Sequence, residues 1–215
     1  MRRAILLVAT MALTLLVASG VALAVNKIGT NGPDTLTGTD GDDNLTGTDG
    51  DDNLLGKGGN DTLFSLAGDD NLLGGPGKDR VLGGEKNVGN GHHPSGGHKN
   101  LLGGDGNDFV VGGRGVDNVV GGEGNGLLAT LPFRRDRSKD KIFGGDGNDA
   151  VNVINKAPVQ LADVIVCGDG RDVVLVDRKD VVAADCEKVF VGLGSVDAWF
   201  EAMPDDFLEE LPPFL

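Results

Sequence analysis

The sequence contains no tyrosine and only one tryptophan, and aromatic residues make up 4% of its 215 positions. Aromatic side chains supply the large, flat contact surfaces on which ligands such as sugar rings can stack. The near absence of these side chains argues against a glycan-binding protein.

The common catalytic motifs are also missing. The chain has no G-x-S-x-G or H-E-x-x-H motif and no Cys/His pair with nucleophile character. Ser95 lies near His93 and His98, but this Gly-rich stretch supplies no third member of a triad. We therefore expect that the protein is not an enzyme, and that the segment around these histidines is an insertion rather than a transition-metal loop.

Basic residues are scarce, and two of them belong to the N-terminal segment. Residues 1–24 combine Arg2 and Arg3 with an apolar run and the small-x-small site Ala22-Leu23-Ala24, which is typical of a secretory signal peptide. An uncleaved membrane anchor is the alternative, because residues 4–24 carry no charge. Without the segment, 17 basic residues face 33 acidic ones, a net charge of −16. We expect a secreted, extracellular or cell-surface protein that binds neither nucleic acid nor anionic membranes.

Glycine and aspartate recur with a period of nine residues. The octapeptide GTDGDDNL appears at residues 38–45 and again at 47–54. Counting each unit from its first glycine, position 6 is Asp and position 8 is apolar in most units. The pattern predicts about fifteen units over residues 25–175, in which Val88, Lys99 and Gly126 replace the Asp.

One unit consists of a turn and a short strand. Its first six residues are rich in Gly, Asn and Asp, which form turns, and its last three favour a strand. Such units cannot form a meander with a core, so we expect an all-β solenoid in which two units make one coil. Strands 18 residues apart would then pair in parallel, about 4.8 Å apart, with position 8 pointing inward.

Stacked coils bring like charges together. Aspartates two units apart would lie in neighbouring coils, where their carboxylates repel each other. A divalent cation between the coils removes this repulsion, and Ca²⁺ accepts six to eight carboxylate and carbonyl oxygens in flexible geometry. Mg²⁺ suits the turns less well, and Zn²⁺ or Cu²⁺ would require His or Cys ligands. The alternative is an Asx ladder that stabilises the turns without metal.

These units resemble the RTX (hemolysin-type) calcium-binding nonapeptide GGxGxDxUx, which the chain approaches in GGDGNDFVV (residues 103–111). The resemblance covers about residues 29–175 and implies a parallel β-roll that binds several Ca²⁺ ions. The first units depart from it at Thr30, Thr39 and Thr48. The ligands it implies are position-6 carboxylates and turn carbonyls: Asp34, Asp43, Asp52, Asp61, Asp70, Asp79, Asp108, Asp117, Asp140, Asp149, Asp163 and Asp172, with Gly41, Gly50, Gly59, Gly68, Gly77, Gly106, Gly115 and Gly147.

Irregular stretches near 86–98, 130–134 and 153–157 interrupt the units and are interpreted as insertions. We expect fewer ions in the middle of the roll, where Lys99 places a cation at a ligand position. The spacing predicts that both partners are Asp in these neighbouring pairs: 34/52, 52/70, 43/61, 61/79, 117/140, 140/163 and 149/172.

The two cysteines lie at the end of the repeats. Cys167 begins the last unit and Cys186 follows it, so in a secreted protein we expect one disulfide. We interpret residues 176–194 as a C-terminal cap fixed by this bridge, with a strand VVLV, a turn DRKD and a strand near DCEKVFV. The acidic and aromatic tail, 195–215, is expected to be mostly flexible, with a short docked helix or a partner-binding peptide as the alternatives.

Position 9 is apolar in many units. Leu55, Phe64, Leu73, Leu82 and Leu102 all occupy it, and on a short strand it should point outward. This predicts an apolar stripe that could contact a protein partner or a second copy. Two functions follow: a secreted protein that folds on binding calcium, or a non-catalytic recognition or adhesion module in which calcium is only structural.

Overall fold

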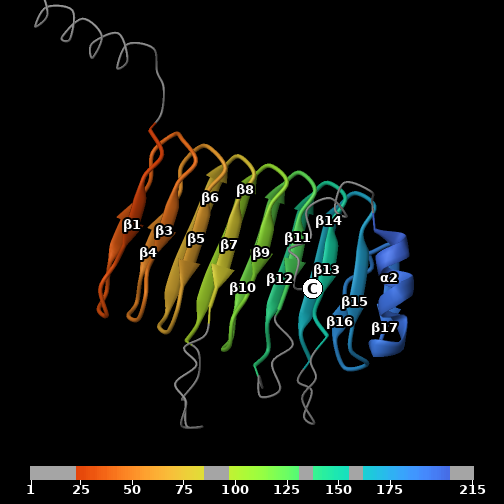
Figure 1. Cartoon of the computed structure of the whole chain (residues 1–215). Helices are drawn as coiled ribbons and strands as arrows, with labels where there is room; N and C mark the ends of the chain where they lie inside the picture. The colour runs from red at the N-terminus through yellow and green to blue at the C-terminus, as the bar shows by residue number, and fades with distance from the viewer. Residues whose placement is uncertain (1–22, 85–96, 131–137, 155–161, 204–215) are drawn as a thin grey trace, which may run out of the picture.

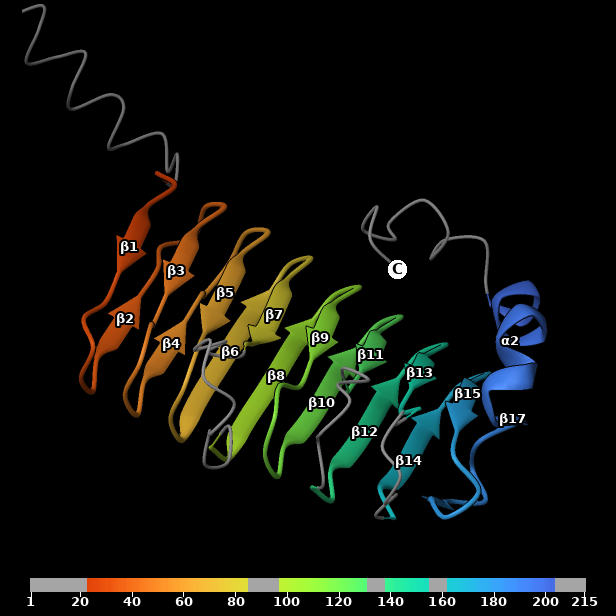
Figure 2. The ribbon, with the colours of Figure 1, turned by 60° about the horizontal axis from the view of Figure 1, so that its bottom comes forward.

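The computed structural model describes residues 23–84, 97–130, 138–154 and 162–203. They form a parallel β-roll in which each coil contributes one strand to each of two facing sheets (Figure 1; Figure 2). The nine odd-numbered strands form one sheet, which we call the odd sheet, and the eight even-numbered strands form the other, the even sheet. At about 4.8 Å per strand, the even sheet extends roughly 34 Å along the axis.

Strands form where three β-favouring residues follow a turn of Gly, Asn and Asp. The odd sheet consists of β1 (Asn26–Ile28), β3 (Asn44–Thr46), β5 (Thr62–Ser65), β7 (Arg80–Gly83), β9 (Phe109–Val111), β11 (Leu127–Ala129), β13 (Ala150–Asn152), β15 (Val173–Val176) and β17 (Lys188–Val191). The even sheet consists of β2 (Thr35–Thr37), β4 (Asn53–Leu55), β6 (Asp70–Pro76), β8 (Lys99–Asp105), β10 (Asn118–Glu123), β12 (Lys141–Asp146), β14 (Val164–Asp169) and β16 (Val181–Val182).

The parallel pairing has the predicted step of two units. Leu36 pairs with Leu54 and Leu54 with Leu72, each 18 residues on. Position 8 points inward along the whole roll, and its side chains form one continuous core. The predicted fold and the predicted orientation of position 8 are therefore confirmed.

The count of about fifteen units needs one correction. Arg80 of β7 pairs directly with Phe109 of β9, and Asp70 of β6 pairs with Lys99 of β8. No coil lies between these strands, so the segment of Val88 is an insertion and not a unit. The other predicted units correspond one to one to strands β2 to β15.

Several even strands are longer than the predicted three residues. Strand β6 runs for seven residues, through the pair Gly74-Gly75. Gly75 and Gly104 pair across neighbouring coils, both with positive φ, so the first part of the next turn stays in the sheet. After β2 and β4 the residue at position 2 is Thr39 or Lys57 instead of glycine, and these even strands end before the turn.

The predicted insertions all occur on the same side of the roll. The ranges outside the described structure, 85–96, 131–137 and 155–161, each follow an odd strand and precede an even one. We call this side the interrupted edge. Turns from even to odd strands, which form the regular edge, are described throughout.

The C-terminal cap matches its prediction in outline. Residues 177–180 form the expected turn, β16 and β17 extend the two sheets, and Cys167 is bonded to Cys186 with their Cα atoms 5.3 Å apart. The tail differs from the prediction, because a 3₁₀ turn (Leu193–Ser195) leads into helix α2 (Val196–Ala202). Residues 204–215 lie outside the described structure.

Helix α2 packs on the outer face of the odd sheet at its C-terminal end (Figure 1). Trp199 is buried among Leu127, Val173 and Leu175, and its Nε1 donates a hydrogen bond to the Val173 carbonyl at 3.2 Å. The amphipathic tail thus covers part of the apolar surface that was expected to be exposed. On the even sheet, Leu73 and Leu102 remain 37% exposed.

Candidate calcium sites

Two rows of position-6 side chains run along the roll, one on each edge. The interrupted edge carries Asp34, Asp52, Asp70, Lys99, Asp117, Asp140 and Asp163, and the regular edge carries Asp43, Asp61, Asp79, Asp108, Gly126, Asp149 and Asp172. From Asp43 onward these aspartates are all almost completely buried. Every Asp/Asp pair predicted from the spacing lies in neighbouring coils of one row. Asp79 and Asp108 form a further pair of this kind, which the spacing did not predict because Val88 was counted as a unit.

Each carboxylate uses Oδ1 to join two coils. Oδ1 of Asp79 accepts a hydrogen bond from the backbone N–H of Asp61 at 2.7 Å, and Oδ1 of Asp108 accepts from Asp79 at 2.8 Å. The same contact recurs across the insertions, as from Asp149 N–H to Asp172 at 2.8 Å. This half of each carboxylate is therefore committed to the backbone without any metal.

The second oxygen has a different environment. Oδ2 is buried without a hydrogen-bond partner, within the described residues, in Asp52, Asp61, Asp70, Asp79, Asp108, Asp149 and Asp172. All but Asp52 and Asp70 lie on the regular edge, and Asp70 Oδ2 has the Lys99 ammonium beside it at 3.5 Å. Because a buried charged oxygen without a partner is costly, these atoms are the strongest indication of a cation between the coils.

A carbonyl oxygen from the next coil lies close to Oδ2 in Asp61, Asp79, Asp108 and Asp149. A Cβ placed on Gly74 would lie 2.6 Å from the Gly103 carbonyl oxygen and would also collide with Asp79 Oδ2. Gly103 makes the same arrangement with Asp108 and the Gly121 carbonyl. Glycine at position 1 thus leaves room where a carboxylate oxygen and a carbonyl oxygen converge. Both are ligands that Ca²⁺ prefers, so the donor set fits this ion.

The position-4 glycines proposed as carbonyl donors form a separate column. A side chain on Gly77 would collide with the Gly59 carbonyl, and one on Gly106 with that of Gly77. Their role as ligands stays a prediction. The position-1 carbonyls beside Oδ2 were not foreseen, because the sequence pattern does not reveal where a carbonyl points.

Position 5 carries a hydrogen-bonded ladder that sequence reasoning also missed. The Asn60 N–H donates to Asp42 Oδ1 at 2.7 Å, and the Lys78 N–H donates to Asn60 Oδ1 at 2.9 Å. Asn107, Asn125 and Asn148 continue it further along the roll. An Asx ladder of the kind considered as the alternative to metal is therefore present at position 5. The recurrence of Asp or Asn at position 5 in Asp42, Asn60, Asn107, Asn125 and Asn148 was the signal in the sequence.

The first coils satisfy their carboxylates differently. Thr30 N–H donates to Asp34 Oδ2 at 2.5 Å, and Thr39 donates to Asp43 Oδ2 through its N–H and, at 3.2 Å, through its hydroxyl. Burial would raise the pKa of Asp43, but the hydrogen bonds from Thr39 and Val25 outweigh it and lower this pKa. The threonines that depart from the nonapeptide pattern thus provide donors of their own.

Farther along the regular edge the balance is reversed. Burial raises the pKa of Asp79 and of Asp149 to about 7 and that of Asp108 to about 6, despite one hydrogen bond from a backbone N–H to each. The neighbouring carboxylates Asp108 and Asp172 raise the pKa of Asp79 and Asp149 further. The coils therefore hold ionised carboxylates poorly unless a cation is bound.

The cap continues both rows. Asp163 N–H donates to Asp180 Oδ1 at 3.1 Å, and Asp172 N–H donates to Glu187 Oε2 at 2.8 Å. Neither residue was predicted from the spacing, because their steps from Asp163 and Asp172 are 17 and 15 residues rather than 18. The Asp-Val-Val at 180–182 was the available signal.

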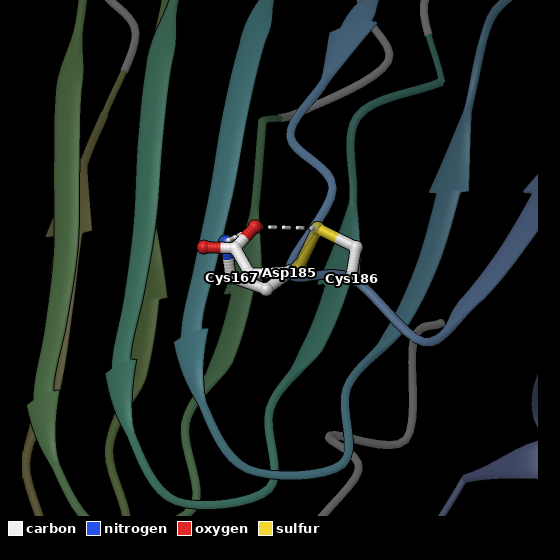
Figure 3. Close-up of side chains that lie close together, drawn as sticks. All are labelled: Cys167, Asp185 and Cys186. Atoms are coloured by element: carbon white, nitrogen blue, oxygen red, sulfur yellow. Dashed lines mark hydrogen bonds between the residues drawn. A yellow bond between two sulfur atoms is a disulfide. The ribbon is translucent and has the colours of Figure 1, made fainter.

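Near the disulfide, Asp185 caps the start of the last unit (Figure 3). Its carboxylate accepts hydrogen bonds from the N–H groups of Cys167, at 3.4 Å, and Gly168, at 3.2 Å. Cys167, Asp185 and Cys186 are the one group of three or more Cys, His, Asp or Glu residues, among those that the structure describes, whose potential ligand atoms all lie within 4.8 Å of one another. Because both sulfurs are in the disulfide, they offer no thiolate, and the group is a structural one.

The family model described as RTX calcium-binding nonapeptide repeat (4 copies) matches residues 28–63, 55–87, 96–128 and 136–152, just over half of the chain. The chain belongs to this RTX family. Repeats of the family typically bind Ca²⁺, and the aspartate rows of this RTX roll are typical of a calcium-binding β-roll. Among curated proteins, none matches the chain.

Proposed function

We propose that the protein is a secreted, non-enzymatic calcium-binding protein whose RTX roll folds outside the cell when Ca²⁺ binds between its coils. This proposal rests on the buried Oδ2 atoms of the regular edge, four of which (Asp61, Asp79, Asp108 and Asp149) lie beside a position-1 carbonyl of the next coil. Bound Ca²⁺ would neutralise the carboxylates, and the residues of this chain would position them through Oδ1. The predicted signal peptide supports secretion, and no described helix has the length and hydropathy needed to span a bilayer.

Folding and binding are coupled because the aspartates are close together only in the coiled state. An ion that binds only this state stabilises it, and the stabilisation grows with the logarithm of the free Ca²⁺ concentration once that concentration exceeds the dissociation constant. Extracellular calcium modules work at dissociation constants of about 10⁻⁴ to 10⁻³ M. The net charge of −16 keeps the calcium-free chain expanded by repulsion.

Far-UV circular dichroism of the chain from Val25 onward, which contains every described strand, tests the proposal. Titration with Ca²⁺ should produce a cooperative coil-to-β transition near millimolar concentration, and Mg²⁺ should not. A full β spectrum in chelator that calcium does not change would reject it.

A recognition or adhesion module is the second candidate. The half-exposed column on the even sheet, which includes Leu73 and Leu102, favours it. Static light scattering in calcium should show self-association that a Leu73→Asn/Leu102→Asn variant abolishes, if this column contacts a second copy. A concentration-independent monomer for both chains would remove self-association as an explanation for the column.

A further inference from the structure

One member of the aspartate rows is a cation. Lys99 occupies position 6 of its unit, pairs in register with Asp70, and its N–H donates to Asp117 Oδ1 at 3.1 Å. Its backbone therefore makes the contacts that an aspartate makes at this position. Only its side chain differs.

That side chain is buried and directed toward the preceding coil. Its solvent exposure is 0%, as is that of the Asp70 side chain. Lys99 Nζ lies 3.5 Å from Asp70 Oδ2 and donates a hydrogen bond to the Gly68 carbonyl at 3.3 Å. The ammonium group thus meets a carboxylate oxygen and a turn carbonyl, the two kinds of oxygen that converge in the calcium sites.

A second substitution coincides with the first. Position 1 of the Asp70 unit is Ser65, whereas the corresponding residues of several other units are glycines whose Cβ would collide with the row carboxylate. The Ser65 side chain is completely buried. In those units glycine leaves room beside the carboxylate. In the Asp70 coil, which pairs with Lys99, the Ser65 side chain occupies the corresponding position.

We propose that the Lys99 ammonium is a tethered cation that takes the place of Ca²⁺ between the Asp70 coil and its own coil. The inference rests on the proposed calcium binding of the other coils. The inference goes beyond that binding, because the Asp70 coil and the Lys99 coil are held together without a metal ion and leave no place for one. A buried charge requires a partner, and here each charge is the partner of the other. The centre of the roll is then held together before any calcium arrives.

Lys99→Asp is the direct test, with equilibrium dialysis against radioactive calcium and hydrogen exchange in chelator. The variant should bind one more Ca²⁺ per chain than the wild type, and in chelator its β6 and β8 amides should lose the protection that they have in the wild type. Lys78→Asp is the matched control, because it changes the charge equally at an exposed position 5, where Asp42, Asp51 and Asp69 occur naturally. It should leave both measurements unchanged.

A Lys99→Asp variant that folds in calcium and binds the same number of ions as the wild type would overturn the inference. If it fails to fold even in calcium, hydrogen exchange of the wild type in chelator decides. The slowest amides should then lie in β6 and β8, and uniform exchange along the roll would overturn the inference. A wild type that binds no calcium would refute the proposed function as well, and dialysis separates that outcome from the others.

Discussion

Each buried aspartate of the regular edge divides its two oxygens between two tasks. In Asp79, Oδ1 accepts the Asp61 N–H while Oδ2 has no hydrogen-bond partner among the described residues. An asparagine would keep the first contact and replace the second oxygen with a neutral donor beside the Gly103 carbonyl. Removal of the charge should therefore have opposite effects with and without calcium.

We expect Asp79→Asn to stabilise the roll in chelator at pH 8 by about 2 kcal/mol, because it removes a buried charge. In saturating calcium it should instead destabilise the roll, because one ligand oxygen is lost. Urea unfolding in calcium measures the second change, and far-UV circular dichroism in chelator measures the first as a larger folded fraction of the calcium-free chain. A variant that is less stable than the wild type in both would show that the Asp79 carboxylate serves the backbone alone.

Glycine at position 4 allows the coils to approach each other. Gly106 has a φ of 139°, and a Cβ there would collide with the Gly77 carbonyl. We expect Gly106→Ala to lower the free energy of unfolding in calcium by 2 kcal/mol or more, as an order-of-magnitude value from backbone strain and overpacking. Gly58→Ala is the control, because its nearest new contact is 3.8 Å away and it should cost less than about 0.5 kcal/mol.

At the scale of elements, α2 and the cap close the C-terminal end of the roll. Helix α2 is only seven residues long, so it depends on packing rather than on its own propensity. Trp199 supplies most of that packing and a hydrogen bond to β15. The disulfide holds the turn before β17 against the last full coil.

Trp199→Ala should release α2 without unfolding the roll. Hydrogen exchange in calcium is expected to speed up at α2 and the neighbouring face of β15 and β17, while core strands such as β10 and β12 keep their protection. Loss of about 3 kcal/mol of local stability corresponds to roughly a hundredfold faster exchange. Val191→Ala, at a side chain that is 47% exposed, should leave the α2 exchange unchanged.

Replacing both cysteines with alanine tests how much the disulfide stabilises the C-terminal cap. The bridged residues are 19 positions apart, a loop for which chain entropy predicts a loss of about 3 kcal/mol. Urea unfolding in saturating calcium should show this loss, and a reducing agent should reproduce it in the wild type. A loss below about 1 kcal/mol would mean that β16, β17 and Asp185 hold the cap without the bridge.

At the scale of the whole molecule, the carboxylates of the regular edge titrate together. Their pKa values in the folded state, about 7 for Asp79 and Asp149 and about 6 for Asp108, exceed the ordinary value of 3.8. The calcium-free folded state therefore binds more protons than the unfolded chain between about pH 4 and 7. Its stability is greatest below this window and falls as the pH rises through it.

We expect acidification from pH 8 to 5 in chelator to increase the folded fraction of the calcium-free chain and the temperature at which that fraction unfolds. The apparent calcium affinity should fall over the same range, because protons compete for Oδ2. Circular dichroism melts and calcium titrations at several pH values measure both effects. A calcium-free chain that becomes less stable toward pH 5 would contradict this assignment of buried carboxylates.

The nine-residue period was sufficient to predict the coils, the inward position 8 and both Asp rows, because each of these depends on regular spacing. The errors occurred where the step changes. Val88 fills the expected interval, but β6 pairs directly with β8 and β7 with β9, whereas Asp180 and Glu187 extend the rows at shortened steps. Helix α2 and the position-1 carbonyls depend on contacts between distant segments, which a single sequence does not specify.

The two edges have different tolerance for added chain. Between Asp79 and Asp108 the sequence advances by 29 residues, yet the Asp79 N–H still reaches Asp108 Oδ1 at 2.8 Å, as in coils of 18. The rise from coil to coil is therefore fixed by the sheets and by the regular edge, whatever the length of chain on the other side. A foreign peptide inserted after an odd strand would be displayed at a set multiple of about 4.8 Å from the next one. The roll can therefore serve as a molecular ruler, because the regular edge keeps a constant spacing between coils while the interrupted edge accepts inserted segments.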